Sequence, residues 1–274
     1  MKYVRFETLD TVVKYGVVDG EKIHGIKGSI FNSYEIGTKS YFFDQVKLLA
    51  PVEPSKIIGF GLNYQDHAEE IGETLPKEPM FFLKPPNSII GHYENIIYPK
   101  QTQNLHYEVE LAIVIGKTAK NISYHEASNY ILGYTIANDL TARDLQEIDG
   151  QWGRAKGFDT FCPLGPWIET DVQDVNNLKI VLKVNDKVKQ NSNTKNLSFD
   201  CYKLIEFVSQ ITSLFPGDVI LTGTPGGVGP LQIGDKVEAY IESIGTLENT
   251  VTSCVDSEFG GIKKCGQLFK TVPL

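Results

Sequence analysis

The sequence predicts a β-rich α+β protein. Runs of β-branched and aromatic residues recur along the chain, and many are separated by short turns of the kind that join antiparallel strands. Few segments show the apolar spacing of an amphipathic helix. With 274 residues, 41% of them hydrophobic, the chain is long and apolar enough for one large domain or two modest ones.

Residues 1–50 are predicted to form a small β-rich N-terminal domain. Residues 12–18 and 22–26 have strand composition, and the Asp19-Gly20 pair between them is typical of a hairpin turn. A connection that contains two prolines then leads to a larger domain over residues 51–274.

The larger domain opens with a buried strand, residues 56–64, followed by a short helix. His67 and Glu70 lie three residues apart in this helix and therefore share a face. A Glu beside a His orients the imidazole ring and raises its basicity, as a general base requires. The alternative is a chance His–Glu contact on a surface helix. Lys84 ends the next strand and is either a cation near a site or a strand-end charge.

Residues 106–115 have the composition of one strand that carries two carboxylates on the same face. Side chains alternate across a strand, so Glu108 and Glu110 point the same way, while the opposite face is wholly apolar. Burying two like charges unpaired is expensive, and a bound cation is the simplest remedy. The alternative is that this end of the strand is exposed and both carboxylates are solvated.

A third carboxylate, Asp139, lies in the strand pattern of residues 133–141. The helical turn after it places Arg143 and Gln146 three residues apart, so they can share a face. Lys156 follows in a loop rich in glycine, proline and aromatic residues, a composition that is often functional. Its small neighbours would allow its ammonium to be directed inward.

The glycine-rich stretch 223–229 lacks the ending of a phosphate-binding loop. It predicts either close approach of the backbone to a ligand, with Thr224 supplying a hydroxyl, or a simple turn. The rest is framework: hairpins over residues 179–190 and 236–252, and a helix capped by Asp200 whose apolar residues follow helical spacing. These are Leu204, Ile205, Val208 and Ile211.

Charge and composition argue against several classes of function. The formal net charge is −8, without a basic block, which argues against nucleic-acid binding. The N-terminus lacks the apolar segment of a signal peptide, and no apolar run reaches membrane-spanning length. The four cysteines form no C-x-x-C pair and are expected to be reduced thiols in a cytoplasmic protein.

The three carboxylates Glu108, Glu110 and Asp139 are hard oxygen ligands, and no Cys or His stands at zinc spacing. Such a ligand set favours Mg²⁺ or Mn²⁺ over Zn²⁺.

Five stretches together resemble the fumarylacetoacetate hydrolase family, from about residue 51 onward. One such motif would be weak evidence, but five in the same order are specific. They are GLNYQDHAEE at 61–70, YEVEL at 107–111, NDLTARDLQ at 138–146, KGFDT at 156–160 and LTGTPGG at 221–227.

The resemblance implies a mixed β-sandwich or roll with a small N-terminal domain, usually a homodimer. It implies that Glu108, Glu110 and Asp139 bind Mg²⁺ or Mn²⁺. The roles it implies for the other residues are an acid/base pair, His67 with Glu70, a catalytic Lys156, and substrate contacts from Gln146, Thr224 and Arg143. The chain departs from the family pattern in showing no clear fourth carboxylate within residues 57–64 and in carrying Leu62 where many relatives have a polar residue.

The resemblance therefore implies a metal-dependent enzyme that acts on a 2-oxo acid through a metal-stabilised enolate. The first expectation is C–C bond hydrolysis of an acylpyruvate such as fumarylpyruvate. The alternatives are decarboxylation of an oxaloacetate-like acid, isomerisation of 2-hydroxyhepta-2,4-diene-1,7-dioate, dehydration of a sugar acid, and metal-dependent binding of a 2-oxo acid without catalysis.

Overall fold

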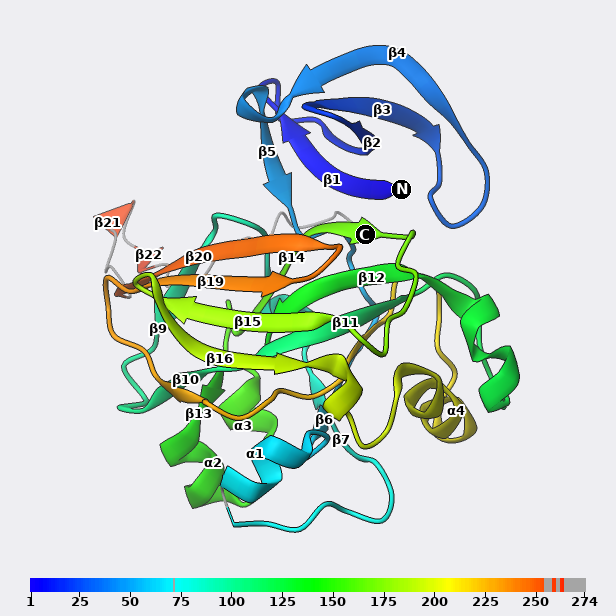
Figure 1. Ribbon diagram of the computed structural model, residues 1–274. Coiled ribbons are helices and arrows are strands. Elements are labelled where there is room, and N and C mark those ends of the chain that lie inside the picture. The colour runs from blue at the N-terminus through cyan, green and yellow to red at the C-terminus, as the bar shows by residue number, and fades with distance from the viewer. Residues whose placement is uncertain (71, 254–257, 260–261, 264–274) are drawn as a thin grey trace.

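The computed structural model describes residues 1–70, 72–253, 258–259 and 262–263. Over these residues the strands form a 12-stranded sheet, a five-stranded sheet and two smaller ones, with few helices (Figure 1). The prediction of a β-rich α+β protein is thus confirmed. No helix of the described part of the chain is long and apolar enough to cross a membrane.

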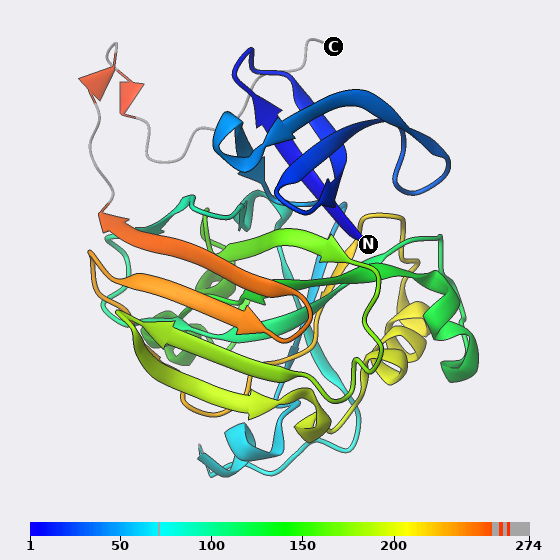
Figure 2. The ribbon, with the colours of Figure 1, turned by 45° about the horizontal axis from the view of Figure 1, so that its top comes forward.

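The first five strands form a lobe on one side of the larger body (Figures 1 and 2). Its hairpin of β2 and β3 turns where the sequence predicted. Val4, Phe6, Ile23 and Tyr41 fill its core. The strands are β1 (Lys2–Thr8), β2 (Val13–Asp19), β3 (Lys22–Gly28), β4 (Tyr34–Phe42) and β5 (Val46–Leu49), with the 3₁₀ turn η1 (Phe43–Gln45) before β5.

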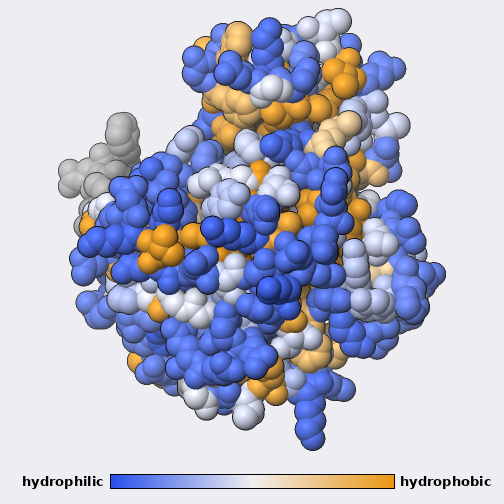
Figure 3. Space-filling model, in the orientation of Figure 1, coloured by the Kyte–Doolittle hydropathy of each residue, from blue (hydrophilic) through white to orange (hydrophobic). Residues whose placement is uncertain are grey.

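The lobe is joined to the body through sheet hydrogen bonds and an ion pair. Lys2 and Tyr3 pair with Glu169 and Ile168 of β14 (Cys162–Glu169), and the N-terminal ammonium lies 2.9 Å from the Glu169 carboxylate. Figure 3 shows a mostly hydrophilic face on which apolar residues gather along the base of this lobe.

The body is built from two packed sheets. The first continues from β14 through β12 (Ile131–Asn138), β11 (Val109–Ile115), β17 (Val219–Leu221), β6 (Ile57–Gly61) and β7 (Met80–Lys84). The second runs in the order β16 (Lys187–Asn193), β15 (Lys179–Val184), β19 (Lys236–Ile241), β20 (Gly245–Ser253) and β9 (Asn95–Tyr98). Buried side chains of both sheets, such as Ile113 of β11 and Leu182 of β15, fill one core between them. Both predicted hairpins of the second sheet are present.

The helices lie in two groups at the edges of the sheets (Figure 1). Near one end, α4 (Cys201–Ile211) packs against the 3₁₀ helix η3 (Tyr124–Tyr130). The Asp200 side chain caps α4 as predicted, but Ile211 is 53% exposed, because it lies in the last turn, beyond the face that meets the core. The other group holds α1 (Gln65–Glu70), α2 (Arg143–Asp149) and α3 (Gly153–Lys156).

The strand predicted over residues 106–115 is in fact two strands. β10 (Leu105–Tyr107) ends before Glu108 and pairs with β13 (Thr141–Ala142) and β18 (Gly229–Pro230) in a three-stranded sheet. The break occurs because the Glu108 backbone N–H donates to the Asn138 side chain, 2.8 Å away, instead of to a neighbouring strand. The strand predicted over residues 133–141 likewise ends early, at Asn138, so Asp139 directly follows it.

The remaining short elements include the 3₁₀ turns η2 (Pro86–Ser88) and η4 (Thr194–Asn196). Strand β8 (Ile89–Ile90) pairs with β14, and β21 (Glu258–Phe259) and β22 (Ile262–Lys263) form the two-stranded sheet. Two of the four predicted thiols, Cys162 and Cys201, are free and buried. Cys254 and Cys265 lie outside the described residues.

Candidate metal centre

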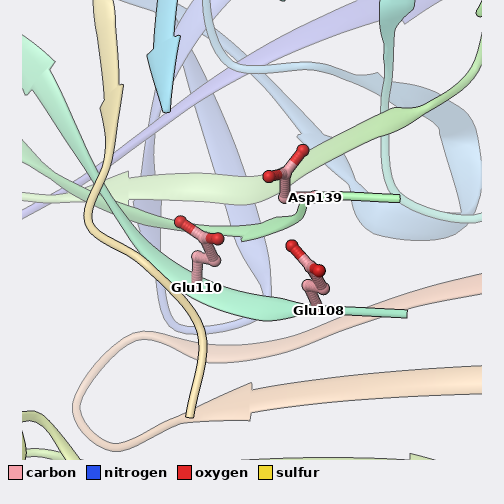
Figure 4. Close-up of side chains that lie close together, drawn as sticks. All are labelled: Glu108, Glu110 and Asp139. Carbon is pink, nitrogen blue, oxygen red and sulfur yellow. The ribbon is translucent and has the colours of Figure 1, made fainter. Parts of the chain in front are cut away.

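Three carboxylates lie close together where β11 begins and β12 ends. Glu108 lies between β10 and β11, Glu110 lies in β11, and Asp139 directly follows β12. One carboxylate oxygen of each lies within 4.8 Å of the others, and Figure 4 shows the side chains pointing toward one another. Glu108 is 4% exposed, Glu110 1% and Asp139 0%. The alternative of a solvated strand end is therefore wrong.

Two buried lysines reach the cluster from different elements. The Lys156 Nζ, from α3, donates to Glu108 Oε2 at 2.8 Å and to Asp139 Oδ2 at 2.5 Å. The Lys84 Nζ, from the end of β7, lies 2.7 Å from Asp139 Oδ1. Lys84 is therefore a cation of the site, and the alternative of an isolated strand-end charge is wrong.

Arg143 at the start of α2 supplies a third positive charge. Its Nη2 pairs with Glu108 Oε1, and its Nη1 donates to Gln146 Oε1 at 2.8 Å, so the two residues share a helix face as expected. Its Nε donates to His106 Nδ1 at 3.3 Å. Burial and the nearby Arg143 charge lower the pKa of His106 to about 4, so its ring is a neutral acceptor at pH 7.

Burial and the surrounding charges shift the pKa values of the groups in this site in different directions. Burial alone would raise the pKa of Glu108, but Arg143, Lys156 and His67 outweigh it and hold that pKa well below its usual range. Burial raises the pKa of Glu110 well above its usual value, and repulsion by Asp139 and Glu108 adds to the rise. Burial would lower the pKa of Lys156, but Asp139 and Glu108 raise it, so this amine stays protonated.

His67 and Glu70 form a contact within the short helix α1. The His67 Nδ1 lies 3.4 Å from Glu70 Oε2, and His67 is only 8% exposed. His67 is among the groups whose charge lowers the pKa of Glu108. Leu62, just before this helix, has a φ of 52°, which is rare for a branched side chain and marks the sharp turn at the end of β6.

The glycine-rich loop after β17 lies against these groups. The Gly223 N–H donates to Glu110 Oε2 at 2.6 Å, and the Gly227 N–H donates to Glu70 Oε2 at 2.9 Å. A Cβ on Gly227 would lie 2.2 Å from the Lys189 carbonyl oxygen, so only glycine fits there. The predicted close approach of the loop backbone is therefore present, and the groups that its N–H groups bind are the Glu110 and Glu70 carboxylates of the protein itself.

Thr224 sits inside this network. Its hydroxyl donates to the Val109 carbonyl at 3.0 Å and accepts from Gln190 Nε2 at 2.8 Å. Sequence reasoning missed Gln190, because one polar residue in a strand pattern gives no sign of a buried partner on another sheet. A substrate contact by Thr224 stays a prediction, and its oxygen has one acceptor position left for it.

The residues present fit a divalent cation. The donor set is wholly carboxylate oxygen, and it is buried. Among the residues that the structure describes, no cation lies within hydrogen-bond distance of Glu110, unlike Glu108 and Asp139. A hard cation beside Glu110 would relieve the repulsion that raises its pKa. Glu108, Glu110 and Asp139 are the residues that would hold it.

Fold and site together define a β-rich protein with a buried all-carboxylate centre that could hold a divalent cation. The chain belongs to the fumarylacetoacetate hydrolase family: the model of the fumarylacetoacetate (FAA) hydrolase C-terminal domain matches residues 56–252. The model of an Rv2993c-like N-terminal domain matches residues 1–51. Members of this family are enzymes, with hydrolases, isomerases and tautomerases among them.

Three relatives bear on the function. The mitochondrial oxaloacetate tautomerase FAHD2A of Bos taurus is 46% identical over 219 residues, covering 76% of this chain and 70% of the relative. The structure of 5-carboxymethyl-2-hydroxymuconate delta-isomerase from Mycobacterium smegmatis is 44% identical, covers 92% of this chain and 100% of that one, and has a TM-score of 0.86. Maleylpyruvate hydrolase from Sphingobium, solved with manganese and pyruvate, is 30% identical over 92% of this chain and 99% of that one, with a TM-score of 0.77.

Proposed function

We propose that this protein is a divalent-metal-dependent enzyme that moves a proton on a small 2-oxo dicarboxylic acid, with keto–enol conversion of an oxaloacetate-like substrate as its reaction. The observation that carries the proposal is the buried three-carboxylate cluster with the Lys156 ammonium bound to it. The His67–Glu70 pair is joined to it through the loop whose N–H groups bind both Glu110 and Glu70. This arrangement combines a cation site, a fixed positive charge and a proton-transfer group.

Similarity favours proton transfer over bond hydrolysis. The two named relatives with more than 40% identity are a tautomerase and an isomerase, and both names describe the movement of a proton and a double bond. The hydrolase relative is 30% identical. We therefore place keto–enol conversion ahead of the acylpyruvate hydrolysis expected from the sequence.

Mg²⁺ or Mn²⁺ at the carboxylates would supply Lewis-acid polarisation of the substrate's keto group. The protein's own groups would do the rest. His67, oriented by Glu70, would take a proton from the carbon next to the keto group. The Lys156 ammonium would stabilise the negative charge that develops on the keto oxygen. Return of one proton to that oxygen gives the enol, so atoms and charge balance. The reverse sequence gives the keto form.

Acylpyruvate hydrolysis is the second candidate, and the His67–Glu70 pair is the observation that favours it. The same base could take a proton from water, whose oxygen would add to the distal carbonyl. The C–C bond would then break, and its electron pair would leave as an enolate that takes up a proton to give pyruvate.

The test compares substrates under identical conditions. The interconversion of enol and keto oxaloacetate, the loss of fumarylpyruvate and the release of CO₂ are followed with Mg²⁺, with Mn²⁺ and with chelator, in wild type and Glu110→Gln. Cation-dependent acceleration of the keto–enol conversion, lost in the variant, supports the proposal. Cation-dependent loss of fumarylpyruvate alone would move the assignment to hydrolase, and release of CO₂ alone would move it to decarboxylase.

A further inference from the structure

The Arg143 guanidinium is held at each of its nitrogens by a different side chain. Nη2 pairs with Glu108, Nη1 donates to Gln146 Oε1 at 2.8 Å, and Nε donates to His106 Nδ1 at 3.3 Å. These contacts together fix the plane of the guanidinium as well as the position of its charge. Without the contact at Nε, the plane would be free to turn about the line through the other two nitrogens.

Among these acceptors, His106 is the one that is neither a candidate cation ligand, as Glu108 is, nor a predicted substrate contact, as Gln146 is. Its ring contacts Asn104 instead, whose Oδ1 lies 2.9 Å from Nε2. The Arg143 Nε–H requires an acceptor, so Nδ1 of His106 carries no proton. The ring proton is therefore on Nε2, which donates to Asn104.

Asn104 is itself anchored to the start of helix α2. Its carbonyl accepts the Arg143 backbone N–H at 2.9 Å, and its own N–H donates to Thr102 Oγ1 at 3.1 Å. The Thr102 hydroxyl donates in turn to Asp144 Oδ1 at 2.5 Å. One turn of the chain thus fixes both the backbone of Arg143 and the ring that holds its side chain.

Arg143 needs such support if it is to bind an anion. The chain has a formal net charge of −8, so a site for a carboxylate depends on local cations. The Arg143 side chain is 18% exposed, and ordering a long side chain that reaches solvent costs conformational entropy. A cation at the carboxylates would compete with Arg143 for the charge of Glu108, whereas both ring nitrogens of His106 are already engaged.

We propose that His106 is a positioning residue that keeps the Arg143 guanidinium oriented at the centre and thereby sets how tightly the site binds the carboxylate of its substrate. The inference rests on the proposed function, which makes that substrate a 2-oxo acid, and adds the residue that orients this arginine. His106 acts through Arg143 and is not assigned a contact with the substrate or the cation.

The experiment measures binding of oxalate by titration calorimetry in excess Mg²⁺. Oxalate resembles the 2-oxo acid end of the substrate and has no C–H bond to react. His106→Leu removes the acceptor for Arg143 Nε, whereas His106→Asn keeps an oxygen close to the position of Nδ1. We expect the affinity for oxalate to fall by about tenfold or more in His106→Leu, the usual scale for a residue that orients a ligand-binding group, and by much less in His106→Asn.

His92→Leu is the matched control. The His92 ring is also partly buried and also accepts a hydrogen bond at Nδ1, from the Glu248 N–H at 3.0 Å. It lines a cleft beside the N-terminal lobe, together with Phe43 and Trp167, rather than the carboxylate centre. His92→Leu should therefore bind oxalate as tightly as wild type, and a loss equal to that of His106→Leu would overturn the inference.

A double-mutant cycle separates positioning of Arg143 from a structural role of the His106 ring in strand β10. Arg143→Lys keeps a positive charge that can pair with Glu108 but has no Nε–H, so His106 has no group to orient. We expect Arg143→Lys to weaken oxalate binding, and His106→Leu to weaken it no further in that background. Additive losses would show that the ring acts independently of Arg143 and would overturn the inference.

Mg²⁺ affinity without oxalate, circular dichroism and thermal unfolding are measured on every variant. If His106→Leu lost as much affinity for Mg²⁺ as for oxalate, the defect would lie in the cation site and the inference would be wrong. Wild-type oxalate affinity in Arg143→Lys would contradict it too, even if His106→Leu did not fold. A protein that shows the expected oxalate affinities but converts no 2-oxo acid would contradict the proposed function and leave this inference standing.

Discussion

The Glu70 carboxylate accepts a hydrogen bond from the Gly227 N–H at 2.9 Å while it lies 3.4 Å from the His67 ring. One side chain thus ties helix α1 to the loop that also contacts Glu110. Because α1 has only six residues, it is too short to be stable by itself, and such a tether holds His67 in place.

Two substitutions at Glu70 separate its two contacts. Glu70→Gln keeps an oxygen for Gly227 but removes the charge beside His67, so we expect a loss of kcat of about tenfold or more with little change in KM. Glu70→Ala removes both contacts and should also raise KM. Steady-state kinetics with the proposed oxaloacetate-like substrate measures both effects. Equal kinetics for the two variants would show that the contact with Gly227 does not matter, and near-normal kinetics of Glu70→Gln would show that the charge does not.

Replacing His67 tests the proposed proton-transfer group directly. His67→Ala should lower turnover by about 10²–10⁴-fold, because the site would lose its base while the carboxylates remain. Cation affinity, measured by calorimetry, should stay close to that of wild type. His125→Ala, at an exposed position of η3, serves as the control. Near-normal turnover of His67→Ala would contradict the acid/base assignment, with decarboxylation as the reaction least dependent on this group.

Glu110→Gln should separate stability from activity. Glutamine keeps the acceptor for the Gly223 N–H but removes the charge that Glu108 and Asp139 repel. We expect cation affinity to fall by at least about 100-fold and activity to be lost with it. In chelator at pH 8 the midpoint of thermal unfolding should rise by about 2–4 °C, a gain of roughly 1 kcal/mol. A lower midpoint in the variant would contradict the repulsion argument.

Asp218 makes a separate prediction about the fold. Its carboxylate is fully buried and pairs with Lys56 Nζ at 2.5 Å. It also accepts the backbone N–H groups of Ser55, Lys56 and Phe215. Asp218→Ala should therefore lower the free energy of unfolding by about 3–5 kcal/mol, and Asp218→Asn by less. Urea denaturation measures both, with Glu206→Ala on an exposed ion pair as the control.

His92 predicts a dependence of stability on pH. Burial lowers its pKa to about 4 in the folded protein, against 6.5 when exposed. Between these values the unfolded chain binds the extra proton, so this histidine makes the fold less stable as pH falls from about 6.5 to about 4. His92→Asn should reduce the loss of unfolding free energy between pH 7 and pH 5 by about 1 kcal/mol, since solvent screens the ring in part. Parallel urea titrations of wild type and variant measure the difference, and an equal loss in both would contradict the prediction.

Local patterns in the sequence predicted the elements whose cause is local. The hairpin at Asp19-Gly20 and the Asp200 cap depend on residues a few positions apart, and both are present. The nearness of Glu108 to Glu110 follows from strand alternation alone, although the strand itself breaks at Glu108.

What the sequence could not predict depends on partners far along the chain. The break at Glu108 requires the Asn138 side chain, thirty residues away. The partner of Lys84 is Asp139, and the partner of Thr224 is Gln190, on a strand of the other sheet. No spacing rule links such pairs, because only the completed fold brings them together.

The parallel pairing of β17 with β6 has a consequence for how the molecule is made. These strands are far apart in the sequence, yet β17 lies between β11 and β6, and its following loop holds Glu110. Contacts at such long range form slowly, because a large loop must close first. During synthesis, a chain whose residue 223 is still inside the ribosome would lack the Gly223 N–H that binds Glu110, so its cation site would be incomplete.

A cation that binds only the finished site would stabilise only finished molecules, by mass action. Cellular supply of Mg²⁺ or Mn²⁺ would then govern how long the protein survives proteolysis, as well as how fast it works.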